Sequence, residues 1–235
     1  GSVAVVDQDI MNVLFRNEML YMSATYNFNA CFYIYGVEYS FKIYHTTFNG
    51  CAFTGSITGA NTNYCGGFVG WKAGTANFNN CVFAPTAITF DYTTGNSANF
   101  SRNGGTFNNC YYTQTCGTGW TQGKLMHSIM GALGITVANA GTATSYTPET
   151  STIVGYGTGI KFNNILYAGN GDNVSLTLSG GDNYMADHGT LTGSGSSYTL
   201  TMEDNDTYIF VPNTVSVSAN PSNGGTVNGG GQYGN

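Results

Sequence analysis

One short phrase, Phe-Asn-x-Cys, occurs four times in the first half of the sequence and constrains the fold more than any other feature. The copies end at Cys31, Cys51, Cys81 and Cys110. The last two intervals between these cysteines are nearly equal, and the first is shorter. Self-similarity with a period of roughly 20 to 50 residues is typical of stacked repeat architectures. Chance matches in a chain rich in Phe and Asn are the alternative, and the regular spacing argues against them.

Each copy is interpreted as a strand, a tight corner and a second strand. The Asn after Phe, and Gly50 likewise, tolerate the left-handed backbone region that a corner needs. Residues two apart on a strand share a face, which places Cys51 with Phe53 and Cys81 with Phe83. This unit fits one turn of a right-handed parallel β-helix. Turns stacked about 4.8 Å apart would place Phe over Phe, Asn over Asn and Cys over Cys.

The composition favours an extended β architecture and excludes several partners. Only 8% of the 235 residues are charged, 34 are Gly, and the net charge is −6 with six Lys and Arg in all. Nucleic acid and anionic membranes are therefore disfavoured. No long apolar run predicts a membrane span, and no secretion signal is found at the start. A first residue other than Met and a Gly-rich end suggest a trimmed chain, cut within a module.

Six cysteines raise the question of disulfides, and those of the repeat are expected to be buried free thiols. Parallel neighbours in register lie at a plausible distance but approach poorly for bridging. A bridge between Cys65 and Cys116 stays open. Zinc is not expected, because there is no Cys-x-x-Cys and the three histidines are scattered: His45, His127 and His188.

Two segments carry helix-like patterns. Residues 7–22 place apolar side chains at three-four spacing and predict a short helix that covers the first turn of the coil, with an irregular strand as the alternative. Residues 122–135 predict a junction with one or two helical turns, ended by Gly131 and Gly134. Between Cys31 and Thr147 the only acidic residues are Glu38 and Asp91, whereas seven lie between Glu149 and Asp206, so a domain boundary is expected between 125 and 135.

Within the coil, Asn61–Lys72 (NTNYCGGFVGWK) and Phe78–Phe83 (FNNCVF) resemble the glycine-rich GLUG-like repeats of large surface proteins from gut anaerobic bacteria. The resemblance covers about residues 45–125 and ends with Thr121–Met126 (TQGKLM). It implies β-helix turns that pair a Gly-Gly-Phe-Val-Gly-Trp strand with an Asn-Cys-x-Phe strand, and it implies no activity. The first turns depart from it, because no such glycine strand precedes Cys51.

The predicted domains are a β-helix with its N-terminal cap (1–125), a small β-rich module (126–212) and the start of a truncated further repeat (213–235). The second domain reads as short strands near 153–154, 160–167, 174–178, 199–202 and 208–211, separated by Gly, Asn and Ser turns. Phe162-Asn163-Asn164-Ile165 echoes the repeated phrase. Tyr167–Leu178 and Gly189–Met202 resemble the divergent internalin-type, β-grasp-like surface repeats of bacteria. A small β-sandwich is the alternative, and the tail after 213 forms an arm or an extra strand.

No catalytic, cofactor-binding or metal-binding residue can be named from the sequence. A β-helix polysaccharide lyase or glycoside hydrolase needs carboxylates on one shared turn, with a base. The coil offers only scattered candidates: Glu38, Asp91, Lys42, Lys72 and Arg102. The run Glu203–Asp206 could bind Ca²⁺ but lacks the Gly and terminal Glu of a calcium loop, so a solvated turn is the favoured interpretation. Asp172 and Asp182 lie in Gly-Asn turns that suit local hydrogen bonding.

The aromatic residues divide between core and surface. Phe48, Phe78 and Phe107 are predicted to fill the coil, and one of Tyr111 and Tyr112 must face solvent. Trp71 and Trp120 could stack on sugar rings if they are exposed.

The sequence therefore predicts a mostly β, non-catalytic, structural or adhesin-like fragment of an extracellular, cell-surface protein. The resemblance implies the localisation and the adhesive role. The alternative is a carbohydrate-binding module, and the expected partners are host or dietary glycans or surface proteins.

Overall fold

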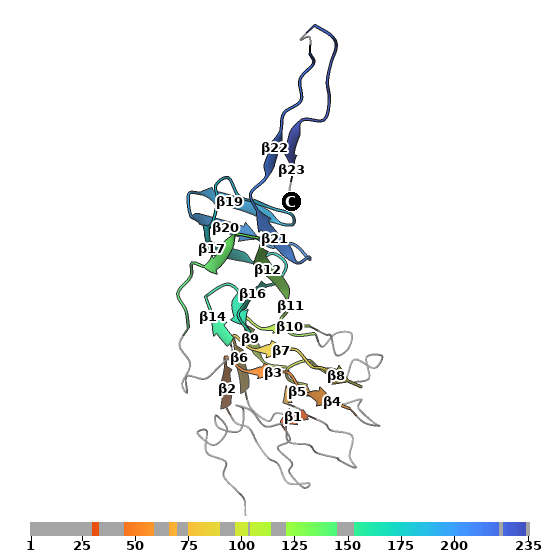
Figure 1. The fold of residues 1–235 in the computed structure, drawn as a ribbon. Helices are drawn as coiled ribbons and strands as arrows, with labels where there is room; N and C mark the ends of the chain where they lie inside the picture. Colours follow the sequence, from red (N-terminus) through yellow and green to blue (C-terminus); the bar gives the residue numbers. More distant parts are fainter. Residues whose placement is uncertain are drawn as a thin grey trace, which may run out of the picture.

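The computed structural model describes residues 30–32, 45–58, 66–69, 75–89, 97–102, 104–113, 121–144, 153–220 and 223–233. Every regular element within these ranges is a β-strand. Short parallel strands make up the first half, and mainly antiparallel sheets make up the second (Figure 1). The predicted mostly-β class is confirmed. Several predicted features lie outside the described residues: the helix at 7–22, Cys65, Cys116, Trp71 and Trp120.

The first half is a stack of small parallel sheets in which strands of successive turns lie side by side. The sheets are β1 (Ala30–Phe32) with β5 (Gly66–Val69); β2 (His45–Asn49), β6 (Thr75–Asn79) and β9 (Thr106–Asn108); β3 (Ala52–Phe53), β7 (Val82–Phe83), β10 (Tyr111–Tyr112) and β11 (Lys124–Leu125); and β4 (Ser56–Ile57) with β8 (Ala87–Ile88). One full turn of the stack runs from Phe48 to its partner Phe78.

The predicted ladders form for three of the four copies of the phrase. Phe78 lies opposite Phe48 and Phe107, with ring centroids 4.7 Å and 5.3 Å apart and nearly parallel planes. On the other face of the same strands, Asn79 Nδ2 donates to Asn49 Oδ1 at 2.9 Å, and Asn108 Nδ2 donates to Asn79 Oδ1 at 2.9 Å. The interior ladder buries apolar surface, while the exterior ladder satisfies its own amides along the stack.

The corner of the phrase lies one residue later than predicted. The left-handed residue is the third of each copy, with φ of 60° at Gly50, 52° at Asn80 and 49° at Asn109. The Asn after Phe is extended instead, because it belongs to a strand of the ladder. Gly and Asn are the residues that take up the left-handed region at least cost, which explains their position here.

The part of the first copy that the structure describes, Ala30 and Cys31, departs from the four-copy prediction. Its Cys31 lies in β1, and β1 pairs with β5 rather than with the strand that follows Cys51. The physical reason is length. The interval from Cys31 to Cys51 is only about two thirds of the interval from Cys51 to Cys81, which spans one full turn. The first copy is therefore out of phase with the later ones and reaches a different sheet.

The thiols of the other three copies are free, as predicted. Cys81 is fully buried and its Sγ donates to the carbonyl oxygen of Phe48 at 3.5 Å. Burial raises the pKa of Cys81 well above its usual value, whereas a hydrogen bond from Cys81 lowers the pKa of Cys51. Cys51 is the more accessible of the two.

Next to the segment Ala98–Ser101, which pairs with β5, the buried side chain of Gln122 takes the place of a further strand. Its Oε1 accepts hydrogen bonds from the backbone N–H groups of Phe100 (3.0 Å) and Ser101 (2.8 Å), and its Nε2 donates to the Ser101 carbonyl at 2.6 Å. Asn99 completes the cap: its Oδ1 accepts from the Gln122 N–H at 2.8 Å and its Nδ2 donates to the Gln122 carbonyl at 2.6 Å. A buried strand edge is thus satisfied by side-chain and backbone amides.

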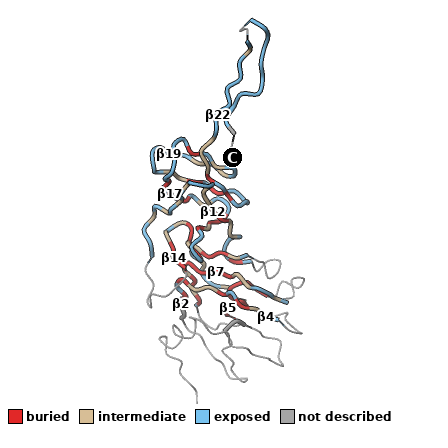
Figure 2. The backbone as a smooth tube through the Cα atoms, in the orientation of Figure 1, coloured by how far each residue is buried: buried red, intermediate tan, exposed pale blue. Residues whose placement is uncertain are grey.

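The second half consists of two sheets around one core. The first sheet has β14 (Ile153–Gly155), β15 (Ile160–Phe162), β16 (Ile165–Ala168), β12 (His127–Gly131), β21 (Thr207–Phe210) and β18 (Met185–Ala186); the second has β13 (Thr136–Asn139), β17 (Asn173–Ser179), β20 (Ser197–Thr201) and β19 (Thr190–Ser194). Alternate residues of β17 point inward, and Leu176 and Leu178 pack with Ile129 and Ile209 of the opposite sheet. Figure 2 shows buried residues in both halves.

The predicted helical junction at 122–135 is wrong, because this segment supplies β11 and β12. β12 pairs with β16 on one side and runs parallel to β21 on the other, so two sets of ladder hydrogen bonds outweigh any local helical preference. The chain beyond Phe210 leaves the body as a hairpin of β22 (Asn213–Val215) and β23 (Gly231–Tyr233), an exposed arm in Figures 1 and 2.

Candidate functional site

The two halves meet at an apolar cluster formed by residues of both. The outer face of the β3–β7–β10 sheet carries Val82 and Tyr111, both at most 1% exposed. They are covered by Ile153 and Ile160 of the β14–β15 hairpin, which packs on this outer face of the stack. An apolar face that would otherwise meet water is therefore buried, and this burial joins the halves.

A polar cluster around Asp172 closes the same junction. Tyr111 Oη donates to Asp172 Oδ2 at 3.0 Å, and the Gly169 N–H donates to the same oxygen at 2.8 Å. Lys124, on the last strand of the stack, forms an ion pair with Asp172 and donates to the Asn170 carbonyl at 3.2 Å. Burial, and then the charge of Asp172, raises the pKa of Tyr111 strongly, so this phenol stays protonated. The predicted local role of Asp172 in its turn is confirmed, and the structure adds its long-range partners.

The acidic turn Glu203–Asp206 also forms polar contacts with β12. His127 Nε2 lies 2.8 Å from Asp204 Oδ1, and the Ser128 N–H donates to Asp206 Oδ1 at 2.7 Å. Both carboxylates are largely exposed, at 67% and 65% of their side-chain surface. Among the described residues no group of three or more His, Cys, Asp or Glu side chains has a geometry that could hold a metal ion. The exposure of these two carboxylates agrees with a solvated turn.

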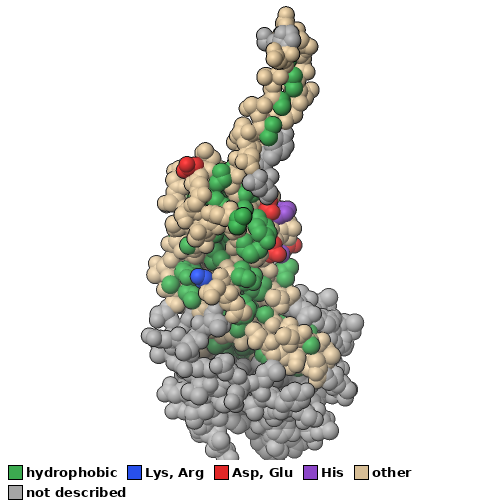
Figure 3. All heavy atoms as spheres, viewed as in Figure 1, with side chains coloured by type: hydrophobic (Ala, Val, Ile, Leu, Met, Phe, Trp, Pro, Cys, Tyr) green, Lys and Arg blue, Asp and Glu red, His purple; other side chains and the backbone are tan. Residues whose placement is uncertain are grey.

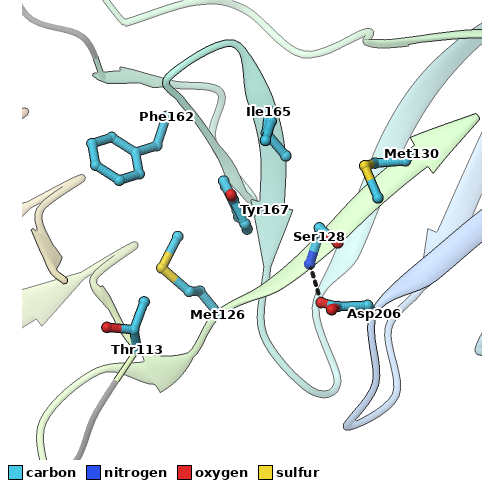
Figure 4. A pocket seen from close by; sticks show the side chains of 8 residues that line it. All are labelled: Thr113, Met126, Ser128, Met130, Phe162, Ile165, Tyr167 and Asp206. Atoms are coloured by element: carbon cyan, nitrogen blue, oxygen red, sulfur yellow. Dashed lines mark hydrogen bonds between the residues drawn. The ribbon is translucent and has the colours of Figure 1, made fainter. Parts of the chain in front are cut away.

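A shallow hollow of about 280 Å³ lies beside this turn (Figure 4). Its wall combines residues from the end of β10, the strands β12, β15 and β16, and the acidic turn: Thr113, Met126, Ser128, Met130, Phe162, Ile165, Tyr167 and Asp206. Ser128 and Met130 alternate along β12 and so point to one face, and Met126 lies just before this strand. Burial, and then the charge of Asp206, raises the pKa of Tyr167.

Some of the residues singled out from the sequence lie where they were predicted, and others do not or lie outside the described residues. Phe48 and Phe78 are core residues, and Phe107 packs against the same core while partly buried, as predicted. Tyr112 packs against the core of the coil, whereas Tyr111 lies on the outer face and is buried beneath the β14–β15 hairpin instead of facing solvent. Several candidates lie outside the described residues: Glu38, Asp91, Lys42, Lys72, Trp71 and Trp120.

Sequence reasoning missed Gln122 and Lys124, and it missed the hollow. Gln122 holds the end of the stack and Lys124 pairs with Asp172. The alternation of Met126, Ser128 and Met130 is the one signal that could have indicated an exposed strand face.

No family model, curated protein or solved structure matches the chain. Within the described part of the chain, no helix has the length and apolar character needed to cross a bilayer.

Proposed function

We propose that this chain is a non-catalytic structural and adhesive part of an extracellular, cell-surface protein. In this proposal the stack is a right-handed parallel β-helix related to the GLUG-like repeats, and it acts as a stiff stalk. The second half is a small module that the stalk presents. Host or dietary glycans or surface proteins are its proposed partners.

The observation that carries the proposal is the β14–β15 hairpin, which joins the two halves. The β14–β15 hairpin belongs to the second half by pairing, yet its Ile153 and Ile160 pack on the outer face of the stack. The ion pair of Lys124 with Asp172 and the buried hydroxyl of Tyr111 reinforce the same joint. Interfaces that are apolar and satisfied in their polar groups restrict relative motion of domains, which is what a stalk that presents a module requires.

The second half favours a β-sandwich over the β-grasp alternative. Two sheets share one core, to which β17 and β20 contribute Leu176 and Leu200, both fully buried. The described residues of this half, 121–144 and 153–220, contain no helix to fill the concave side of a grasped sheet. The relation to internalin-type repeats remains part of the proposal and rests on the turns and strands of 167–202.

The rigid joint is testable by ¹⁵N NMR relaxation. If the halves form one body, amides of β6 and of β17 report the same overall tumbling, with the anisotropy of an elongated particle. Separate correlation times for the two halves would contradict the stalk. A matched pair of variants sharpens the test: Ile160→Asp, in the joint, should uncouple the tumbling, and Ile165→Asp, on the exposed side of the next strand, should not.

A glycan array with and without calcium separates this proposal from a carbohydrate-binding module. A specific glycan signal that is lost in Trp71→Ala or Trp120→Ala would make the coil a sugar-binding surface. A glycan signal that depends on calcium would indicate that the acidic turn Glu203–Asp206 binds calcium. A blank array in both buffers leaves the structural role as the better account.

A further inference from the structure

The outer face of the six-stranded sheet is more apolar than a solvated face needs to be. Its neighbouring strands β16, β12, β21 and β18 carry Ile165, Met130, Tyr208 and Met185. Ile165 is 37% exposed, Tyr208 is 45% exposed and Met185 is 40% exposed. Met130 lies directly opposite Tyr208 in the parallel pair. Figure 3 shows hydrophobic surface over this part of the molecule, with acidic and histidine side chains beside it. The hollow is the indented end of this face.

The size of the hollow excludes large ligands. Pockets for drug-sized molecules measure roughly 300 to 1,000 Å³ and enclose most of the ligand. About 280 Å³ in an open wall suits one long side chain or one small group. Sugar recognition would call for a flat aromatic ring open to solvent, whereas in this wall Phe162 is only 7% exposed and Tyr167 is partly buried. The thioethers of Met126 and Met130 and the aliphatic side chain of Ile165 form the apolar part of the wall, and thioethers adapt to a flexible hydrocarbon stem.

The charge at the rim selects the head group of such a side chain. The carboxylate of Asp206 is positioned by the Ser128 N–H, and its contacts with Ser128 and His127 both use Oδ1. Asp206 lines the hollow and its side chain is 65% exposed (Figure 4). Among the described residues, those that line the hollow include no Lys or Arg, and the chain as a whole carries −6. A cation is the complementary charge.

We propose that this hollow docks one Lys or Arg side chain of a partner protein. Its hydrocarbon stem lies on Met126, Met130 and Tyr167, and its charged head pairs with Asp206. The adjoining apolar band then covers neighbouring residues of the same partner. Long basic side chains combine an apolar stem with a charged tip, which matches a thioether-lined hollow with a carboxylate at one edge. The inference rests on the adhesive role proposed above and narrows its partner to a protein with exposed basic residues.

The test uses methionine methyl resonances of the full chain and a defined probe, Nα-acetyl-lysine methylamide. We expect the Met126 and Met130 signals to shift in a saturable way, while that of Met202, buried in the core, stays in place. The norleucine analogue has a similar stem but no ammonium group, and it should shift them far less. Asp206→Asn preserves an oxygen that accepts from Ser128, so the fold is kept. This variant should weaken probe binding about fivefold, the value of a roughly 1 kcal/mol exposed ion pair.

Asp182→Asn is the matched control, because Asp182 is an exposed turn residue of the same half. It should bind the probe as the parent chain does. Equal shifts with norleucine, or equal binding by Asp206→Asn, would overturn the proposal, as would shifts produced by N-acetylglucosamine and not by the lysine probe. None of these results affects the outcome of the tumbling experiment. A failure of the docking proposal can therefore be distinguished from a failure of the stalk proposal.

Discussion

Replacing Gln122 by Met should destabilise the stack more than any other single change at an uncharged polar side chain near its end. Met has a similar length and shape, so the change removes hydrogen bonds without opening a large cavity. The N–H groups of Phe100 and Ser101 lose their shared acceptor, and the Ser101 carbonyl loses its donor. Three buried bonds at about 1 kcal/mol each predict a loss of ~3 kcal/mol in the free energy of unfolding.

Scanning calorimetry and hydrogen exchange measure this effect and its location. For a chain of this length, ~3 kcal/mol corresponds to a fall in Tm of about 6 to 12 °C. The amides of Phe100 and Ser101 should lose their protection first, while those of β17 keep theirs. Gln232→Met, at an exposed position of β23, is the control and should change the stability by less than about 0.5 kcal/mol. If both variants unfold alike, Gln122 does not replace a strand and the capping argument is refuted.

Four other outcomes follow from the ladders, the turns and the junction. Phe78→Ala, in the middle of the ring stack, should lower the free energy of unfolding by about 3 to 5 kcal/mol in urea titrations, and Phe107→Ala, at the less buried end, should cost less. Asn164→Ala should cost about 1 kcal/mol because φ is 64° there, and Asn164→Gly should be nearly neutral in the same assay. The raised pKa of Tyr111 contributes stability that is complete below pH 10, the usual value of a phenol, and is lost as pH rises above it. Alkaline denaturation should therefore be less steep in Tyr111→Phe, by up to about 1.4 kcal/mol per pH unit. Cys51→Ser should remove a fast phase of thiol labelling with a disulfide reagent at pH 8, because Cys51 is partly exposed and its pKa is lowered; an unchanged time course would show that this thiol is not accessible.

The ladders could be predicted because the sequence repeats the same residues at a nearly fixed interval. Phe48, Phe78 and Phe107 are separated by one turn each, so a stack that places one places the others. The junction could not be predicted in this way. Tyr111 and Lys124 reach Asp172 across 61 and 48 residues, and none of the three carries a local signal for the other two. Gln122 gives no signal either, because a glutamine that caps a strand edge is indistinguishable in sequence from one on a surface.

The junction segment shows why a local pattern is sometimes undecidable. Met126, Ser128 and Met130 alternate as on a strand, while Leu125 and Ile129 are four apart as on a helix. Neither pattern is long enough to decide, since only a few residues are involved. The decision comes from β16 and β21, which offer ladder partners on both sides of this segment. Both partners come much later in the chain, so no local reading of the segment includes them.

The tripeptide Phe-Asn-Asn shows the same dependence on context in its simplest form. At Phe78-Asn79-Asn80 only the last residue is left-handed, so the chain turns a corner and continues into the next parallel sheet. At Phe162-Asn163-Asn164 both Asn residues are left-handed, with φ of 48° and 64°, and the chain reverses into the antiparallel pair β15–β16. Two successive left-handed residues make the hairpin turn that suits the twist of two strands. Asn79 is held extended in β6 between two paired strands, and its side-chain amide donates to Asn49 and accepts from Asn108. The composition of the turn thus permits both outcomes, and the stacked neighbours select between them.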